Sequence, residues 1–353
     1  MPHPAWHPES LAARLPFLRR RALLTQATRA FFTARGYIEV ETPYAVPTPG
    51  EEVHLRAFAT RREHPDGTGK KLWLHTSPEF AMKKLLVGGA GPIFQLARVW
   101  RNGEASDLHA AEFTMLEWYR PGASMDGLIA ETMALLRAVL PPVVTCRGVT
   151  TDLRTVERLT LAEAFARHVG ADLLGTAGDA PALAAAAEVR LRDNETWEDL
   201  FFRLLLARVE PRLGRAHPSF LTHWPAAQAA LARRDPADPR VAERFELFVC
   251  GIELANAFVE LTDAAEQRTR FVADRARRHA LGQGKMHGEL PGAMPGAMDA
   301  TSHGEADPDW PLDEDFLTAL AHGMPAAAGI ALGFDRLAMI AAGADRIDQV
   351  LWL

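Results

Sequence analysis

The 353-residue sequence predicts an α+β protein in which helices flank an antiparallel β-sheet. The first observation is a hairpin pattern between Phe94 and Pro121, where two runs of period-two alternation surround a polar loop at Asn102 to Ala111. The second is a strand-rich run, Arg244 to Asp263, that follows a long stretch of helical composition. A hairpin pairs its strands antiparallel, so these observations favour an antiparallel sheet with helices packed beside it.

The N-terminal third is expected to contain two helices with extended segments between them. Leu and aromatic residues at helical spacing predict a helix from Ser10 to Ala34, capped at Ser10 and stopped by Gly36. A proline-rich extended segment follows at 37–50, and a short strand is expected at 72–75. A second helix begins after Ser77-Pro78, because a serine followed by proline is typical of a helix N-terminus.

The rest of the chain is interpreted as the remainder of one domain, residues 1–353, with two interruptions. A helix at 126–140 ends at a proline pair, and an Ala- and Leu-rich stretch predicts a mainly helical insertion at about 141–240. The Gly-, Pro- and Met-rich stretch at about 282–311 is expected to be a mobile loop. The closing segment, 329–337, predicts a strand, a glycine turn and the start of a helix.

Composition places the chain among ordinary globular proteins. Thirty-nine basic and 45 acidic side chains give a net charge of −6, so no overall basic field favours nucleic acid. The two cysteines, Cys146 and Cys250, fit no metal spacing and indicate a reducing compartment. The 13 histidines form no paired spacing typical of metal ligands. No apolar run resembles a signal core or a membrane span, so a cytoplasmic protein without membrane contact is expected.

Glu117 is the first candidate site residue. It lies between aromatic residues on a strand that otherwise reads as buried, where an unpaired carboxylate costs several kcal/mol. The residues alone leave two interpretations open: a structural pair with an arginine, or a binding site for a cation.

A second candidate is the pair Glu246 and Glu253. Their positions differ in strand parity, so they can share a face only if a bulge or turn lies near Gly251. Two such carboxylates could bind Mg²⁺ together with phosphate oxygens. The alternative is a solvated face of an edge strand.

Arg336 is the third candidate, because it follows Gly333 and Asp335 at an expected helix start. A guanidinium at a helix N-terminus is suited to phosphate. The alternative is an ion pair between Arg336 and Asp335.

Taken together, these segments resemble the class II aminoacyl-tRNA synthetases in their lysyl form. The hairpin with EFTMLEWY resembles motif 2, the first helix and Pro43 resemble motif 1, and the segment with Arg336 resembles motif 3. Thr76-Ser77-Pro78-Glu79 and the string GIELANAFVELTD also match the lysyl form. The resemblance covers most of the chain outside 140–235 and 282–315, and it implies the class II catalytic core, an antiparallel sheet flanked by helices.

Within this group the chain is most similar to the elongation factor P lysine ligases. The sequence before motif 1 has no room for an anticodon-binding domain, so tRNA is not the expected partner. The resemblance implies an ATP-dependent, Mg²⁺-requiring ligase that activates a lysine-type amino acid, (R)-β-lysine, and transfers it to a lysine of elongation factor P. It also implies a homodimer formed through motif 1. Ala331 stands where tRNA synthetases usually carry Gly, which favours a β-amino acid.

The resemblance also assigns roles to individual residues. Arg101 and Arg336 would be catalytic, and Glu246 and Glu253 would hold the metal. ATP would be bound by Arg101, Asn102, Gly103, Glu104, His109, Phe113, Tyr119, Glu253, Leu254, Gly333 and Arg336. The amino acid would be bound by Ser77, Pro78, Glu79, Ala110, Glu117, Tyr119, Asn256, Phe258, Glu260 and Ala331.

Two departures from the family pattern fall in the motif 2 loop. Gly103 stands in place of an acid that contacts ATP, although Glu104 could substitute for it. Ala110 and Ala111 replace an asparagine and a proline, so either the loop is rearranged or the substrate differs. The alternatives are a free amino-acid ligase or tRNA synthetase-like enzyme with another acceptor, and a non-catalytic regulatory paralogue.

Overall fold

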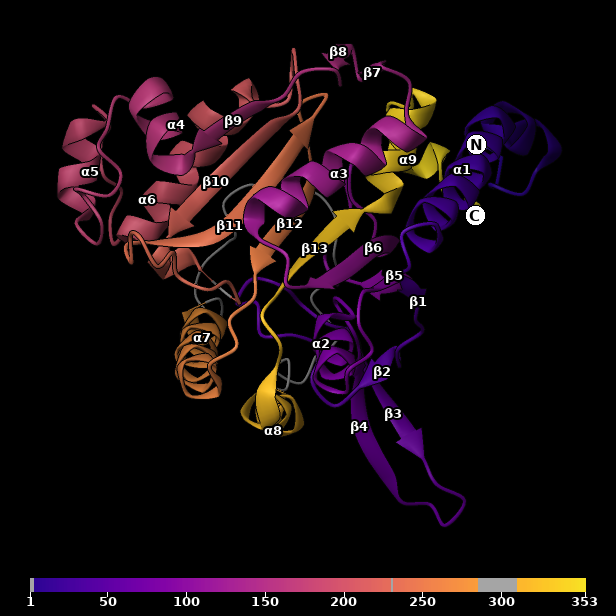
Figure 1. Cartoon of the computed structure of the whole chain (residues 1–353), viewed down its shortest axis with the longest axis horizontal. Helices are drawn as coiled ribbons and strands as arrows, with labels where there is room; N and C mark the ends of the chain where they lie inside the picture. The colour runs from indigo at the N-terminus through magenta and orange to yellow at the C-terminus, as the bar shows by residue number, and fades with distance from the viewer. Residues whose placement is uncertain (1–2, 230, 285–309) are drawn as a thin grey trace.

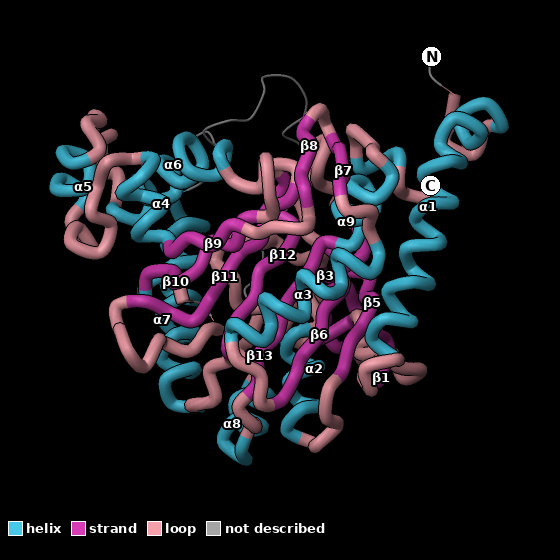
Figure 2. The backbone as a smooth tube through the Cα atoms, turned by 45° about the horizontal axis from the view of Figure 1, so that its top comes forward, coloured by secondary structure: helices cyan, strands magenta, loops and turns pink. Residues whose placement is uncertain are grey.

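The computed structural model describes residues 3–229, 231–284 and 310–353. Its centre is an eight-stranded sheet of order β1-β5-β6-β13-β12-β11-β10-β9 (Figures 1 and 2). The pairs from β5 to β10 are antiparallel, whereas β1 and β9 are parallel to their neighbours at the two edges. The strands are β1 (Ile38–Glu39), β5 (Ile93–Trp100), β6 (Glu112–Pro121), β9 (Glu157–Thr160), β10 (Ser219–Pro225), β11 (Val241–Val249), β12 (Ile252–Val259) and β13 (Ala327–Gly333).

Helices lie on both faces of this sheet. The described helices are α1 (Pro8–Thr33), α2 (Glu79–Val87), α3 (Met125–Val139), α4 (Leu161–His168), α5 (Ala180–Ala186), α6 (Trp197–Leu204), α7 (Ala264–Gly284), α8 (Glu314–Gly323) and α9 (Phe334–Ala342). The main core joins α1, α3 and α9 to one face, where Leu116, Trp118 and Ile330 are buried. A second cluster joins α2 and α8 to the other side of the sheet, with Phe80 stacked on Phe316. The predicted antiparallel sheet with flanking helices is therefore confirmed.

A buried ion pair fastens α1 to α9 and β6. The guanidinium of Arg21 contacts the carboxylate of Asp335 and also donates to Thr114 Oγ1 at 3.0 Å. Asp335, which is 1% exposed, accepts a second hydrogen bond from the Thr114 N–H at 2.8 Å. Because Arg21 takes this carboxylate, Asp335 does not pair with Arg336, and the structural alternative for Arg336 is wrong.

The insertion contains more strand than the sequence predicted. Residues 219–225 form β10, which pairs with β11 and, in parallel, with β9, so the insertion extends the main sheet. The apolar residues Phe220 and Leu221 are fully buried on opposite faces of that strand. A short hairpin, β7 (Val143–Cys146) with β8 (Val149–Asp152), also belongs to this stretch. The helices α4, α5 and α6 pack in a separate cluster around Phe165 and Phe201.

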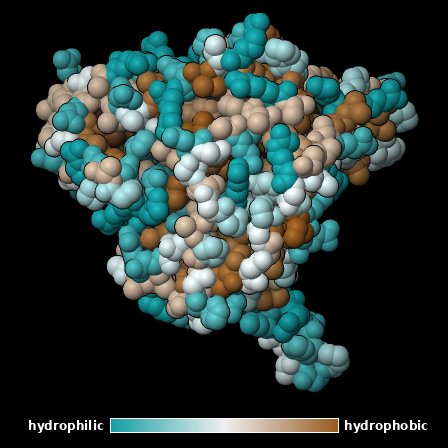
Figure 3. Space-filling view, in the orientation of Figure 1, coloured by the Kyte–Doolittle hydropathy of each residue, from teal (hydrophilic) through white to brown (hydrophobic). Residues whose placement is uncertain are grey.

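A narrow ribbon projects from the body of the molecule. It consists of β3 (Ala59–Glu63) and β4 (Gly69–Leu74), and β2 (Ala45–Val46) pairs with β4 at its base. All residues of β3 are exposed. In the space-filling view the projecting tip is mainly hydrophilic (Figure 3). No helix within the described residues is long and apolar enough to cross a membrane.

The structure refines two of the expected elements. Helix α1 begins at Pro8 rather than after Ser10, because His7 caps it by accepting from the Glu9 N–H. The strand-rich run at 244–263 is a hairpin, β11 and β12, joined at Cys250-Gly251, where a bulge or turn was expected near Gly251. Both turn residues have positive φ, as the tight hairpin turn requires.

The predicted loop at about 282–311 lies mostly outside the described residues. Its described C-terminal end is packed: Trp310 is 5% exposed and contacts Trp73 edge to face.

Candidate active site

The register of the central strands builds the floor of a cavity of about 660 Å³. Glu117 on β6 lies opposite Ala331 on β13, which lies opposite Asn256 on β12, which in turn lies opposite Glu246 on β11. Since side chains two residues apart share a face of a strand, the neighbouring row containing Tyr119 faces the same way. One face of four adjacent strands thus presents polar side chains in an ordered array.

Strand β13 forms the lowest part of this floor, because its residues on the cavity side are small. Gly329, Ala331 and Gly333 all line the cavity, and the side chains of the alternating Ile330 and Leu332 are almost fully buried in the main core. A Cβ atom on Gly329 would lie 2.3 Å from the Tyr119 ring and 2.6 Å from a Glu260 oxygen. The absence of a side chain at 329 therefore lets two larger side chains close over the strand.

The hairpin of β11 and β12 brings Glu246 and Glu253 to the same side. The pairing skips a residue at Leu254, so the bulge changes the parity of Glu253 relative to Asn256. Burial and the charge of Glu253 raise the pKa of Glu246 to about 8, although Arg244 opposes the shift. A divalent cation would relieve this repulsion, so the donor set fits Mg²⁺.

Glu117 is fixed by neighbouring hydroxyl groups. Its Oε2 accepts from Ser77 Oγ at 2.7 Å, and its Oε1 accepts from the Tyr119 hydroxyl at 2.5 Å. The carboxylate is 2% exposed. Burial and the charge of Glu79 raise the pKa of Glu117 to about 8, whereas the two hydroxyl donors hold it down.

Two further acids meet at a buried lysine beside Glu117. The Nζ of Lys83 lies 2.5 Å from Glu79 Oε1 and 2.5 Å from Glu260 Oε2. The other oxygen of Glu260, Oε1, is buried and has no hydrogen-bond partner among the described residues. Glu260 lines the cavity, so this end contains an acceptor that calls for a cationic ligand.

Arg101 stands toward the other end of the cavity, over the face of Phe113. Its guanidinium carbon is 5.2 Å from the centre of the Phe113 ring, and its Nη1 is 3.9 Å from Glu104 Oε1. Arg101 Nε is buried and has no hydrogen-bond partner among the described residues. A donor of this kind, on a permanently charged group, calls for an anionic ligand.

Arg336 is held by groups that leave it facing the cavity. It donates to the Glu253 carbonyl oxygen at 2.7 Å, and its Nη2 lies 2.6 Å from His109 Nε2. Since a guanidinium can only donate, His109 accepts through Nε2 and is neutral. Burial and the charge of Arg336 lower the pKa of His109, which agrees with this protonation state.

Most of the residues assigned from the sequence line this one cavity. They are Ser77, Glu79, Arg101, Glu104, His109, Ala110, Phe113, Glu117, Tyr119, Glu253, Leu254, Asn256, Phe258, Glu260, Ala331, Gly333 and Arg336. Asn102, Gly103, Pro78 and Glu246 do not line it. Gly103 has φ 85°, so a left-handed backbone occupies the position of the expected acid. Glu104, the next residue, reaches the cavity instead.

Arg244 is the most informative residue that sequence reasoning missed. It donates to Asn256 Oδ1 at 3.1 Å and to Glu246 Oε1 at 2.8 Å, and it lies 3.9 Å above the Trp224 ring. It therefore orients two predicted site residues at once. Its strand parity with Glu246 was a usable signal.

Other unassigned lining residues come from α6, α7 and the segment before β3, with Phe202, Asp274 and Glu52 as examples. No sequence motif marks them. Glu210, outside the lining, is a third acid near the carboxylate pair. Burial and the charge of Glu253 raise the pKa of Glu210 to about 7.

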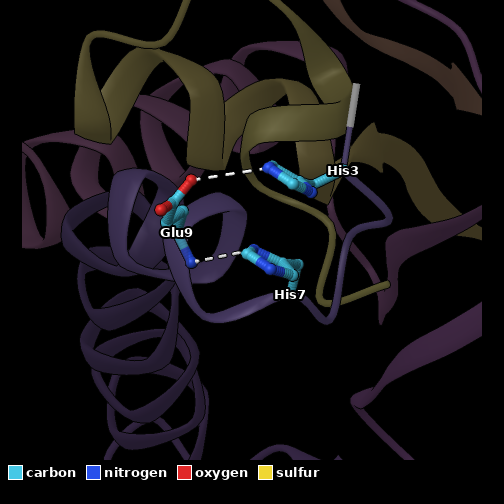
Figure 4. A group of neighbouring side chains, drawn as sticks. All are labelled: His3, His7 and Glu9. Atoms are coloured by element: carbon cyan, nitrogen blue, oxygen red, sulfur yellow. Dashed lines mark hydrogen bonds and ion pairs between the residues drawn. The ribbon is translucent and has the colours of Figure 1, made fainter. Parts of the chain in front are cut away.

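A separate group of ligand-type side chains lies at the N-terminus. His3, His7 and Glu9 are the one set of three in the described ranges whose ligand atoms lie within 4.8 Å of each other (Figure 4). The two imidazoles stack at 3.9 Å, and Glu9 lies 3.6 Å from His3 Nε2. His7 caps α1, and His3 and Glu9 are exposed. The stacking and the capping role account for this arrangement without a metal.

Comparison with known proteins agrees with this geometry. The family described as tRNA synthetases class II (D, K and N) matches residues 13–353. The chain belongs to this family. The prediction of a class II catalytic core is therefore confirmed, and so is that of an ATP-dependent ligase at the level of the family.

Among curated class II relatives, the chain is similar to proteins named elongation factor P–(R)-β-lysine ligase. The protein from Edwardsiella ictaluri is 41% identical over 352 residues, covering 98% of this chain and 96% of the relative. Those from Klebsiella pneumoniae and Hamiltonella defensa are 41% and 40% identical over 351 residues, with the same coverage. The resemblance to elongation factor P lysine ligases is thus confirmed as one of sequence along nearly the whole chain.

Proposed function

We propose that this class II protein activates a lysine-type amino acid, (R)-β-lysine, with ATP and transfers it to a lysine side chain of elongation factor P. One observation carries the proposal. The cavity holds a guanidinium nitrogen of Arg101 and a carboxylate oxygen of Glu260 that are buried and have no hydrogen-bond partner in the part of the chain that the structure describes. A ligand that joins a phosphate or carboxylate to an ammonium group satisfies both. The names of the relatives support the choice of amino acid and acceptor.

In the first step an oxygen of the amino-acid carboxylate attacks the α-phosphorus of ATP, and pyrophosphate leaves. No general base is required, because the attacking carboxylate is already ionised. Arg101 contacts the α-phosphate and the amino-acid carboxylate, and Phe113 stacks on the adenine. Arg336 binds the γ-phosphate. The rate acceleration comes from positioning and from the fixed positive charge near the α-phosphoryl group.

Glu246 and Glu253 are the residues that would hold Mg²⁺. The cation would neutralise charge on the phosphate oxygens. Arg244 holds Glu246 in place from the other side, through its 2.8 Å hydrogen bond. Glu246 therefore keeps a defined orientation before nucleotide binds.

The ammonium groups of the amino acid lie among Glu79, Glu117 and Glu260. The amide nitrogen of Asn256 faces the ligand, because Arg244 occupies its carbonyl oxygen. In the second step the uncharged amine of the acceptor lysine attacks the acyl carbon, AMP leaves, and the amine proton passes to solvent. Elongation factor P is a translation factor, so this reaction is proposed to occur in the cytoplasm.

The central experiment is ATP–pyrophosphate exchange with a panel of α- and β-amino acids, followed by transfer of the labelled amino acid to purified elongation factor P. Exchange is expected with lysine-type amino acids and label is expected on the protein acceptor. Label on tRNA, or on neither acceptor, would favour a synthetase-like or free amino-acid ligase. Absence of exchange with every amino acid would favour the regulatory paralogue.

A homodimer is part of the same proposal. Leu23 on α1 and Ile38 on β1 are 57% and 55% exposed, and both belong to the segment that resembles motif 1. Exposed large apolar side chains on this segment support self-association there. Sedimentation equilibrium of the wild type and of Leu23→Glu measures it, and the variant is expected to be monomeric.

A further inference from the structure

Lys83 is a buried lysine beside the acid end of the cavity, which Glu79, Glu117 and Glu260 form. The proposed chemistry gives this lysine no role. Lys83 is 1% exposed and does not line the cavity, so it cannot touch a ligand. A charged side chain is almost never buried to this extent unless it is paired. Its two partners, Glu79 and Glu260, both line the cavity.

We propose that Lys83 is a positioning residue that holds Glu79 and Glu260 at the cavity wall and offsets one charge of the cavity acids, so that the charge that remains matches the two ammonium groups of a lysine-type amino acid. This inference rests on the proposed function. Glu79, Glu117 and Glu260 carry three negative charges when all are ionised, and Lys83 offsets one of them. The remaining two equal the charge of the two ammonium groups, so the bound acid end is electrically neutral.

The geometry supports an electrostatic role. The charged groups that face Lys83 are Glu79 on its own helix, Glu260 after β12, and Glu117 on β6, where the Tyr119 hydroxyl is also bound. Burial opposes the charge on Lys83, but Glu260 and Glu79 outweigh burial and raise the pKa of the ammonium group. Lys83 in turn lowers the pKa of Glu117 and Glu260, against the larger effect of burial.

Removal of this charge has a defined consequence. Without Lys83, the acids would hold their protons more tightly than they do beside its ammonium group, so a substrate ammonium group would displace those protons only at a greater cost. Binding of the amino acid would then weaken at neutral pH and recover as the pH rises. ATP binds at the arginine end of the cavity, which Arg101 and Arg336 form, so the KM for ATP would be unaffected.

The test compares the wild type with Lys83→Met and with Lys84→Met as the matched control. Lys84 is the next residue of α2, but it pairs with Asp313 at 3.0 Å and Asp315 at 2.7 Å, outside the cavity. In pyrophosphate exchange, Lys83→Met is expected to raise the KM for the amino acid about 10- to 100-fold at neutral pH, as a pKa rise of one or two units requires. Since Glu117 already has a pKa of about 8 beside Lys83, the difference should shrink only as the pH rises past about 9, and Lys84→Met should follow the wild type.

The double variant Glu79→Gln/Lys83→Met guards against a purely structural effect. It restores a net charge of two negative groups, so its pH profile should lie nearer the wild type than that of Lys83→Met. If Lys83 only holds α2 in place, the two substitutions would add, the KM for ATP would rise with that for the amino acid, and no recovery at high pH would occur. Should Lys83→Met not fold, a double variant with an equal loss at every pH would overturn the proposal.

Failure of the proposed function is distinguishable from failure of this inference. Wild-type exchange is measured first with L-lysine, (R)-β-lysine and norleucine, which lacks the side-chain ammonium group. Equal exchange with norleucine, or none with any lysine-type acid, would reject the function itself. Exchange that requires the ammonium group, together with unchanged pH profiles in the Lys83 variants, would reject only the role of Lys83.

Discussion

The two ends of the cavity hold their charges in opposite ways. At the acid end, Glu117 on β6 and Glu260 after β12 are 2% exposed, and Glu260 pairs with Lys83 of α2. At the arginine end, the side chains of Arg101 and Arg336 are 23% and 20% exposed. Arg336 there donates to the backbone carbonyl of Glu253 and contacts His109.

This difference indicates that the acid end discriminates among amino acids, whereas the arginine end binds phosphate groups in general. A buried carboxylate that lacks a partner rejects any ligand that cannot replace its lost hydration, so the acid end can discriminate among amino acids. Partly hydrated guanidinium groups attract any polyphosphate, and their contribution is larger when negative charge develops on the phosphoryl oxygens in the transition state. Changes at the arginine end should therefore alter rate, whereas changes at the acid end should alter choice.

The largest effect is expected from Arg101→Ala. The substitution removes a charged donor from the α-phosphate in the transition state, and exchange should fall about 10²-fold or more. The melting temperature should change little, because Arg101 Nε has no hydrogen-bond partner among the described residues to lose.

Arg98→Ala is the control for Arg101→Ala. Arg98 lies near the end of β5, does not line the cavity, and has a 41% exposed side chain. It should keep wild-type exchange. Full exchange by Arg101→Ala would reject the assignment of the arginine end to phosphate.

The same comparison shows what could be predicted from the sequence. Glu117, Asn256 and Phe258, which line the cavity, could be proposed from the sequence because strand parity and short motifs specify them within a few consecutive residues. Lys83 and Gly329 were missed, because their roles arise only when α2, β13 and the segment after β12 pack together. Position 329 requires glycine because any side chain there would collide with Tyr119 and Glu260.

The limit of sequence reasoning is visible at Glu253. Parity showed that a bulge or turn was required, and the structure has both, but parity could not choose the position of the bulge at Leu254. The insertion was read as helical because Ala and Leu dominate its composition. At 219–225 the chain nevertheless forms strand β10, because burial between β9 and β11 outweighs the helical preference.

The next effect in size concerns Ala331, at the border between the two ends. Its methyl group lies on the cavity floor between Glu117 and Asn256, where it should obstruct an α-amino acid more than a β-amino acid. One methyl group in a pocket changes discrimination about 10- to 200-fold. Ala331→Gly should raise kcat/KM for L-lysine relative to (R)-β-lysine by a factor in that range, with the KM for ATP unchanged. An unaltered ratio would move the search for specificity to the loop at 103–111.

A smaller effect is expected from pH at the acid end. The pKa of Glu117 is raised to about 8 and that of Glu260 to about 7, so both bind protons that a substrate ammonium group must displace. The KM for the amino acid should therefore fall as pH rises through about 7 to 8, by up to about tenfold per unit. The KM for ATP should be flat over the same range.

Whereas amino-acid binding should strengthen as the pH rises, the stability of the protein without ligand should decrease. A carboxyl group whose pKa is raised by folding binds its proton more tightly in the folded state. The free energy of unfolding should then fall as pH rises from the ordinary value of 4.5 toward about 8 for Glu117. Thermal melting across this window, with and without the amino acid, measures it. A melting temperature that rises through the window would contradict buried, proton-binding acids.

The smallest effect is expected from Glu104→Gln. This variant tests whether Glu104 replaces the ATP-contacting acid that the family carries at the position of Gly103. Glu104 Oε1 lies 3.9 Å from Arg101 Nη1, and the two side chains are 25% and 23% exposed. A partly exposed pair of this kind contributes about 0.2–1 kcal/mol, so the KM for ATP should change about two- to fivefold at most. If Glu104 substitutes for the family's acid, the KM for ATP will change and the KM for the amino acid will not. A change confined to the amino acid would instead mean that the altered loop serves the acid end, and that the division of the cavity into a rate end and a choice end is wrong.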